Sequence, residues 1–311
     1  MTKPIQGVLP VVQTPFTDND EIDFPALKRQ VDWAFELGAD GIGTGMASEV
    51  SRLTARERSE LTAKLPEFAA GRGAVFVSVG AESTKQAVLN AKEAAAAGCE
   101  AVMAVPPMTT AVMQSQLTDY FSAIAESVDL PLIVQDASGY VGQEIPFSIY
   151  RELLERFGPE KILFKPEAAP IGPKLSKLRD SAAAAGFEAK ILEGSGGIFL
   201  VDSFRRGIVG TIPGMDLLDG IIALWRALNS GNEAAAYRLA FPISSIVSLQ
   251  MQAGLDGFLA IEKYLLVKRG LMKSPHRRKP YRWELDQETA REVDRLFGIL
   301  QQTLSDPARD N

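Results

Sequence analysis

The chain has 311 residues, of which 46% are hydrophobic and 23% are charged, and its formal net charge is −6. This composition supports a substantial core, so it excludes a disordered or fibrous protein, and the mild acidity argues against a nucleic-acid partner. One cysteine, no apolar run of roughly 20 residues and a start without signal-peptide character predict a cytoplasmic protein with no disulfide framework and no membrane partner.

Short apolar strands alternate with helical patterns over the first 230 residues. Predicted helices start at Asp23 and near Thr54, and others cover 83–97 and 114–128. The predicted strands cover residues 7–14, 41–45, 74–79, 101–105, 132–135, 162–165, 189–193 and 207–212. About eight strands that alternate with helices predict an α/β fold, a (β/α)8 TIM barrel. A doubly wound open sheet is the alternative.

The alternation ends near residue 231. Helical patterns cover 232–254, 255–269 and 286–304 with no strand between them. We therefore predict a catalytic barrel over residues 1–230 and a C-terminal helical domain over residues 231–311. A basic loop at 276–280 contains Arg277, Arg278 and Lys279, which could bind an anion. A solvated loop or a subunit contact is the simpler interpretation.

The strongest candidate for catalysis is Lys165, which directly follows the apolar run Ile162, Leu163, Phe164. Catalytic residues of a TIM barrel lie at the carboxyl ends of its strands. A lysine amine that is removed from water loses its proton more readily and can then form a Schiff base with a carbonyl. Glu167 lies two residues further on, so in an extended chain it faces the same side as Lys165. A lysine that reaches from the strand end to solvent is the alternative.

Several motifs resemble one enzyme family. They are Thr14–Phe16, Ser48 with Glu49, the LTxxER run from Leu53 to Arg58, and the lysine at the sixth strand end. Together they resemble the dihydrodipicolinate synthase / N-acetylneuraminate lyase family of class I Schiff-base enzymes, from about residue 5 to residue 304. The resemblance implies a catalytic Lys165, a barrel with a helical C-terminal domain, and a homotetramer built as a dimer of dimers.

The chain departs from the family pattern at several site positions. The resemblance places Ala47 and Ser48 where the family holds the keto-acid carboxylate, with Ser48 as the only hydroxyl. The same resemblance places Gly194 and Ile212 near that carboxylate. Thr109 stands where the family has its second loop tyrosine.

Two further departures concern catalysis and the second substrate. Gln135 stands where the family has a proton-relaying tyrosine. Tyr140 falls at the position of the synthase arginine that binds the aldehyde's carboxylate, and it is the best replacement phenol, with a packing role as the alternative.

Short strings around these positions resemble another branch of the family. The QDAxG string at Gln135, Ser48 with Glu49, and the FKxE string around Lys165 are similar to L-2-keto-3-deoxyarabonate dehydratases. Both branches use an iminium at C2 of the substrate, which acidifies the C3 hydrogen. Either loss of the C4 hydroxyl or cleavage of the C3–C4 bond can follow.

We therefore expect a lyase that forms a Schiff base with a pyruvate-like 2-keto acid and uses neither metal nor cofactor. A 2-keto-3-deoxy sugar acid dehydratase or aldolase is favoured, with Lys165, Tyr140, Glu167 and Gln135 at its centre. A dihydrodipicolinate synthase that condenses pyruvate with aspartate semialdehyde is the enzymatic alternative. A pseudo-enzyme that binds keto acids without turnover is the alternative from another functional class.

Overall fold

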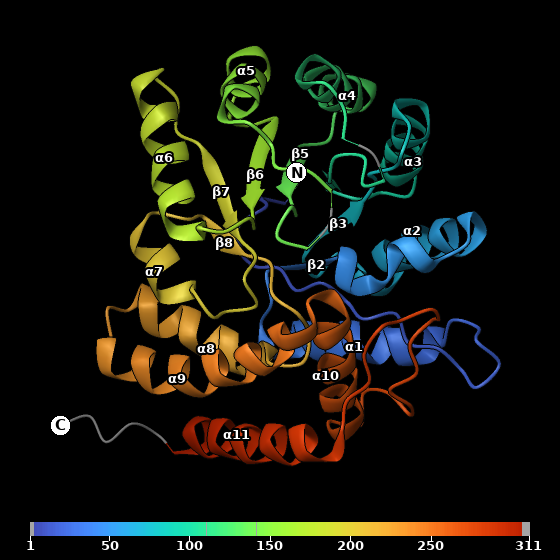
Figure 1. Ribbon diagram of the computed structural model, residues 1–311, viewed down its shortest axis with the longest axis vertical. Coiled ribbons are helices and arrows are strands. Elements are labelled where there is room, and N and C mark those ends of the chain that lie inside the picture. The colour runs from blue at the N-terminus through green and yellow to red at the C-terminus, as the bar shows by residue number, and fades with distance from the viewer. Residues whose placement is uncertain (1–2, 110, 141, 307–311) are drawn as a thin grey trace.

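The computed structural model describes residues 3–109, 111–140 and 142–306, and within them eight parallel strands form a barrel surrounded by helices (Figure 1). Each strand pairs with the next in the chain from β2 to β8, and β8 also pairs with β1. The remaining gap is bridged by Val11 and Gly43, where the Val12 N–H donates to the Gly43 carbonyl at 2.9 Å. The predicted (β/α)8 barrel is confirmed, and the open sheet is excluded.

The strands of the barrel are short. The first is shorter than the predicted 7–14, because Pro10 has no N–H to donate to the second strand. The last predicted strand, 207–212, is also reduced. The bounds are β1 Gly7–Val8, β2 Gly41–Gly43, β3 Ala74–Ser78, β4 Ala101–Ala104, β5 Leu132–Asp136, β6 Ile162–Pro166, β7 Lys190–Glu193 and β8 Gly210–Thr211.

The first three barrel helices begin at side-chain caps. The Asp23 side chain accepts from the Ala26 N–H, and Thr54 forms a reciprocal capping box with Glu57. These helices are α1 Phe24–Leu37, α2 Ala55–Ala69, α3 Thr84–Ala96, α4 Gln114–Ser127, α5 Phe147–Phe157, α6 Ile171–Ala184, α7 Leu200–Arg205 and α8 Leu218–Asn229. Two short 3₁₀ helices, η1 Met46–Ser48 and η2 Val50–Arg52, follow β2 and were not predicted.

The C-terminal residues form α9 Glu233–Gln250, η3 Met251–Ala253, α10 Leu255–Lys268 and α11 Gln287–Ser305. The three predicted helical stretches are therefore present. Helix α9 packs against both α8 and α11, and the group lies along one side of the barrel (Figure 1). The predicted boundary at residue 230 coincides with the turn between α8 and α9, and the division into two domains stays a prediction. None of the described helices is long and apolar enough to cross a membrane.

In the basic loop at 276–280, Arg277 is buried and Arg278 packs onto the barrel, whereas Lys279 is exposed. Arg278 pairs with Glu57 at 2.7 Å, and its backbone N–H donates to Glu49 at 3.0 Å. The fully buried Lys263 of α10 also pairs with Glu49, and burial lowers the pKa of Lys263 to about 8. These contacts tie the C-terminal helices to the loop after β2, and they correct the expectation of a solvated loop for the two arginines.

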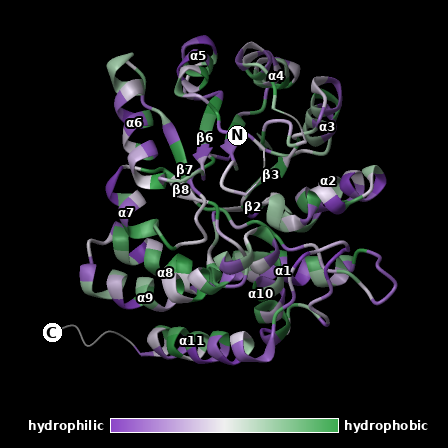
Figure 2. Cartoon of the chain, viewed as in Figure 1, coloured by the Kyte–Doolittle hydropathy of each residue, from purple (hydrophilic) through white to green (hydrophobic). Residues whose placement is uncertain are grey.

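Alternation along the strands determines which side chains enter the barrel. Ile133 and Leu163 belong to the inner apolar cluster, whereas Val134 and Phe164 pack outward against the helices. Strands are largely hydrophobic, while hydrophilic residues lie on the surrounding helices and loops (Figure 2). Because side chains alternate with a period of two, Gln135 and Lys165 point inward at the carboxyl ends of β5 and β6.

Candidate active site

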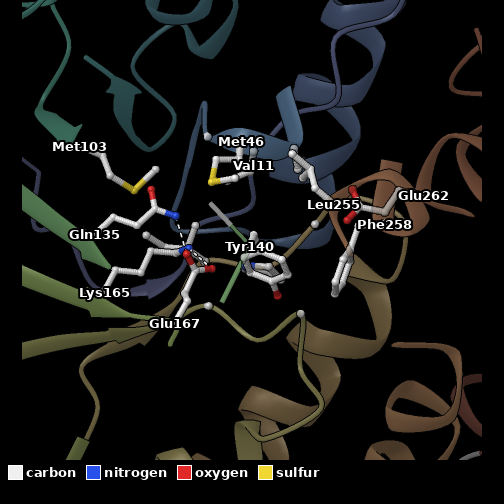
Figure 3. Close-up of a pocket in the computed structure, with 17 residues that line it drawn as sticks. Val11, Met46, Met103, Gln135, Tyr140, Lys165, Glu167, Leu255, Phe258 and Glu262 are labelled. Carbon is white, nitrogen blue, oxygen red and sulfur yellow. Dashed lines mark hydrogen bonds and ion pairs between the residues drawn. The ribbon is translucent and has the colours of Figure 1, made fainter. Parts of the chain in front are cut away.

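A pocket opens at the carboxyl ends of the strands, as the barrel fold requires. It encloses about 560 Å³ of space between atoms, part of it open to solvent. Its lining comes from the ends of several strands, from η1, from the loop after β5 and from α10. Figure 3 shows that Lys165, Glu167 and Gln135 lie together on one side of this pocket.

Lys165 is the chemical centre of the pocket. Its side chain is only 4% exposed, and its amine forms an ion pair with the Glu167 carboxylate. The Gln135 amide donates to the other Glu167 oxygen, and Gln135 is the register partner of Lys165 across β5 and β6. The structure therefore brings together three of the predicted catalytic residues. A buried amine held against a carboxylate can exchange protons with it while it attacks a carbonyl.

The wall beside this pair is the backbone of Gly194. A Cβ at this position would lie 2.5 Å from the Lys165 amine and 2.5 Å from the Glu167 carboxylate, so only glycine leaves room here. The preceding Glu193 is buried and accepts a hydrogen bond from the Thr211 hydroxyl at 2.8 Å. Burial raises the pKa of Glu193, and the contact with β8 fixes the turn that carries Gly194.

Tyr140 lines the same pocket from the loop after β5. Its ring makes an edge contact with Phe258 of α10, with centroids 5.9 Å apart. Burial raises the pKa of Tyr140, and the nearby Glu167, Glu193 and Glu262 raise it further. The phenol therefore keeps its proton at neutral pH and can serve as a hydrogen-bond donor or acid. Within the described residues, no side chain or backbone group bonds to this hydroxyl.

The predicted substrate contacts divide into two groups. Ala47, Gly194 and Ile212 line the pocket. Ser48 and Thr109 do not belong to the described lining. The Ser48 hydroxyl is buried and donates to the Val12 carbonyl at 2.5 Å, while Thr109 is exposed and its hydroxyl donates to Glu82 at 2.5 Å.

Three lining residues, Leu255, Phe258 and Glu262, come from α10 and were not predicted from the sequence. The available signal was a pair of charged residues, Glu262 and Lys263, inside an otherwise apolar helical run. Such a pair within a buried helix face is costly unless each charge finds a partner. The structure gives Lys263 its partner Glu49, and it turns Glu262 toward the pocket.

Two known proteins are similar to this chain over about three quarters of its length. The chain is 30% identical over 239 residues to the L-2-keto-3-deoxyarabonate dehydratase of Azospirillum brasilense, and the match covers 75% of each chain. It is 28% identical over 247 residues to the 4-hydroxy-tetrahydrodipicolinate synthase of Methanosarcina mazei, which covers 78% of this chain and 81% of that protein.

The match extends to solved structures. The dihydrodipicolinate synthase of Rhodopseudomonas palustris superposes with a TM-score of 0.87 at 27% identity, over 96% of this chain and 99% of that one. The family model of the dihydrodipicolinate synthetase family matches residues 4–299. The chain therefore belongs to the dihydrodipicolinate synthetase family and is a lyase of that family.

Proposed function

We propose that this lyase forms a Schiff base between Lys165 and the carbonyl carbon of a 2-keto acid, and that it acts as a 2-keto-3-deoxy sugar acid dehydratase or aldolase. The observation that carries the proposal is the buried Lys165 amine, paired with Glu167 in a pocket at the barrel's catalytic end. The similarity to an L-2-keto-3-deoxyarabonate dehydratase over three quarters of each chain supports the substrate class.

The chemistry follows from the iminium. Attack of the amine on C2 and loss of water give a cationic carbon–nitrogen double bond, which withdraws electrons from C3. In dehydration, a base removes a C3 proton, and the enamine expels the C4 hydroxyl, which leaves as water after it gains a proton. In cleavage, the C4 hydroxyl loses its proton while the C3–C4 bond breaks, and its electron pair enters the iminium. The resulting enamine then takes up a proton at C3, which gives the imine of pyruvate. Water then hydrolyses the imine in both cases.

The neighbouring side chains suit these proton transfers. Glu167 touches the Lys165 amine, so we assign it the transfer of protons at nitrogen and at C3. Gln135 is a positioning residue, because its amide binds Glu167 and does not itself exchange protons near neutral pH. We assign the Tyr140 hydroxyl to the C4 oxygen. Ala47, Gly194 and Ile212 are proposed contacts of the keto acid, while Ser48 shapes the loop and Thr109 stays a prediction without a contact.

The charge distribution of the pocket favours a sugar acid over aspartate semialdehyde. Lys165 is the one cationic side chain among the described lining residues, and the lining also contains the carboxyls of Glu167 and Glu262. The second carboxylate of the synthase substrate pair would thus lack a cationic partner, and such a contact is typically worth about 1.5–3 kcal/mol.

We therefore expect kcat/KM for condensation of pyruvate with aspartate semialdehyde to lie at least ~10-fold below that for a 2-keto-3-deoxy sugar acid. A panel of pentonates and hexonates identifies the substrate, and release of pyruvate distinguishes cleavage from dehydration. Efficient condensation with aspartate semialdehyde contradicts the sugar-acid assignment and supports a synthase.

A keto-acid-binding protein without turnover is the second candidate function. Gln135 favours a protein without turnover. Its side chain lines the pocket at the end of β5, and an amide cannot relay protons there. Incubation with pyruvate and borohydride, followed by intact-mass measurement, decides the first step. An adduct combined with no turnover of any sugar acid or aldehyde supports the binding protein.

Tyr140→Phe tests the proposed acid. We expect kcat on the best sugar acid to fall by ~10²-fold, because a positioned acid typically contributes ~10²–10⁴-fold. The pyruvate adduct should still form, since the phenyl ring keeps its contact with Phe258. Tyr281→Phe, which removes an exposed hydroxyl bonded to Glu284, is the matched control. A loss below tenfold in Tyr140→Phe makes Tyr140 a packing residue and leaves Glu167 as the proton carrier.

The proposed assembly is a homotetramer, as the family resemblance implies. Large apolar side chains are exposed on the described surface, among them Phe241, Tyr237 and Phe199. Exposed aromatic residues are enriched at contacts between subunits. Native mass spectrometry of the intact chain measures the subunit number directly.

A further inference from the structure

Glu262 is a carboxyl in the pocket to which the catalytic chemistry assigns no role. It comes from α10, outside the barrel, and it lines the pocket with Leu255 and Phe258 of the same helix. Figure 3 shows Glu262, with Phe258 beside it, on the opposite side of the pocket from Lys165, and Tyr140 between them. The pocket thus has two polar ends, and apolar side chains such as Met46 lie between them.

The Glu262 carboxyl is held by specific contacts. The Gln13 amide donates to its Oε2 atom. Gly214 makes room for the carboxyl, since a Cβ at this position would lie 2.6 Å from Oε1 and 2.8 Å from Oε2. Among the described residues, no donor bonds to Oε1. One oxygen is therefore fixed by the protein, and the other is available to a molecule in the pocket.

The protonation state of this carboxyl also suits a neutral ligand. Glu262 is buried, and its burial raises its pKa well above the usual value, with the Asp216 carboxyl raising it further. Gln13 and Lys263 lower it by smaller amounts. A neutral carboxylic acid can both donate a hydrogen bond and accept one, which matches the capacity of a hydroxyl group.

We propose that Glu262 determines specificity by binding a hydroxyl on C5 or beyond of the substrate whose C2 is attached to Lys165. This inference rests on the proposed function and extends it from a keto acid to a hydroxylated chain of at least five carbons. A keto acid without a C5 hydroxyl lacks the group that Glu262 would bind, and a chain that ends in a carboxylate meets an acid instead of a cation. Selection of chain length thus depends on the C-terminal helices.

Two substrates that differ at C5 test the proposal. 2-Keto-3-deoxypentonate carries hydroxyls on C4 and C5, whereas 2-keto-4-hydroxybutyrate carries only the one on C4. The measured quantity is the ratio of their kcat/KM values. In Glu262→Leu we expect this ratio to fall at least ~10-fold, because a buried hydroxyl loses its partner. In Glu262→Gln the ratio should stay within about threefold, since an amide also donates and accepts.

A second variant reaches the same end of the pocket without changing Glu262. Gly214→Ala introduces a methyl group against the carboxyl, and the backbone at Gly214 needs no left-handed conformation. It should lower the ratio in the same direction as Glu262→Leu, which keeps the test valid even where Glu262→Leu does not fold. Borohydride trapping of pyruvate in each variant shows that Lys165 still reacts.

The possible outcomes separate the two proposals. A lower ratio in Glu262→Leu or Gly214→Ala, with preserved trapping and a near-normal ratio in Glu262→Gln, supports the specificity role. An unchanged ratio in trapping-competent Glu262→Leu and Gly214→Ala overturns it and leaves the proposed function intact. Absence of both trapping and turnover in the unaltered chain overturns the proposed function, and the role of Glu262 with it.

Discussion

We expect Lys165→Arg to abolish the borohydride-trappable adduct with pyruvate. Turnover of the best sugar acid should fall by ~10⁴-fold or more, the order of loss seen when an enzyme loses its nucleophile. The guanidinium retains the charge next to Glu167 but presents no neutral primary amine. Lys165→Ala gives the same loss of adduct and also leaves Glu167 buried without its cation. Intact mass after reduction, with peptide mapping, measures the result.

A lysine that directly precedes the same strand provides the matched control. Lys161 lies at the opposite end of β6, where its amine donates to the Leu130 carbonyl at 2.7 Å. Lys161→Arg makes the same lysine-to-arginine change at a partly buried position outside the pocket. The adduct on Lys165 should still form in this variant. An undiminished adduct in Lys165→Arg, mapped to another lysine, removes Lys165 from the mechanism.

Gly194→Ala has the second largest expected effect. The added methyl carbon would lie 2.5 Å from the Lys165 amine and 2.7 Å from its Cε atom, so the amine and the Glu167 carboxylate must move apart. Misplacement of reacting groups by about 1 Å can cost ~10²-fold in rate. We expect kcat/KM to fall by that order and the rate of pyruvate trapping to fall with it.

Stability should change little in this variant. Gly194 does not have the left-handed backbone that alanine avoids, and the atoms that yield are the ends of two flexible side chains. Gly298→Ala in α11 is the control, since a Cβ there meets no atom within 4 Å, and alanine favours a helix by about 1 kcal/mol. Thermal melts and trapping rates on both variants provide the measurements. Normal trapping in Gly194→Ala shows that the close packing is not required for reaction.

The contact between Lys165 and Glu167, the proposed catalytic pair, was predictable because it depends on local pattern. Leu163 and Lys165 lie two residues apart on a strand, so the inward position of one fixes that of the other. Glu167 follows at the same spacing, and the structure confirms that it contacts Lys165. Ser48 and Thr109 were assigned by similarity of position alone. In the structure their hydroxyls bond to Val12 and Glu82, because loop residues turn toward whichever acceptor the fold provides.

The sequence by itself determined the barrel, the caps at Asp23 and Thr54 and the lysine at the end of β6. Hydrophobic periodicity and capping residues act over a few neighbouring positions, so one chain is enough to reveal them. Only the tertiary structure decided that α10 closes the pocket and places Glu262 opposite Lys165. These residues lie nearly 100 positions apart in the chain. Their proximity depends on how the C-terminal helices pack on the barrel, which local patterns do not specify.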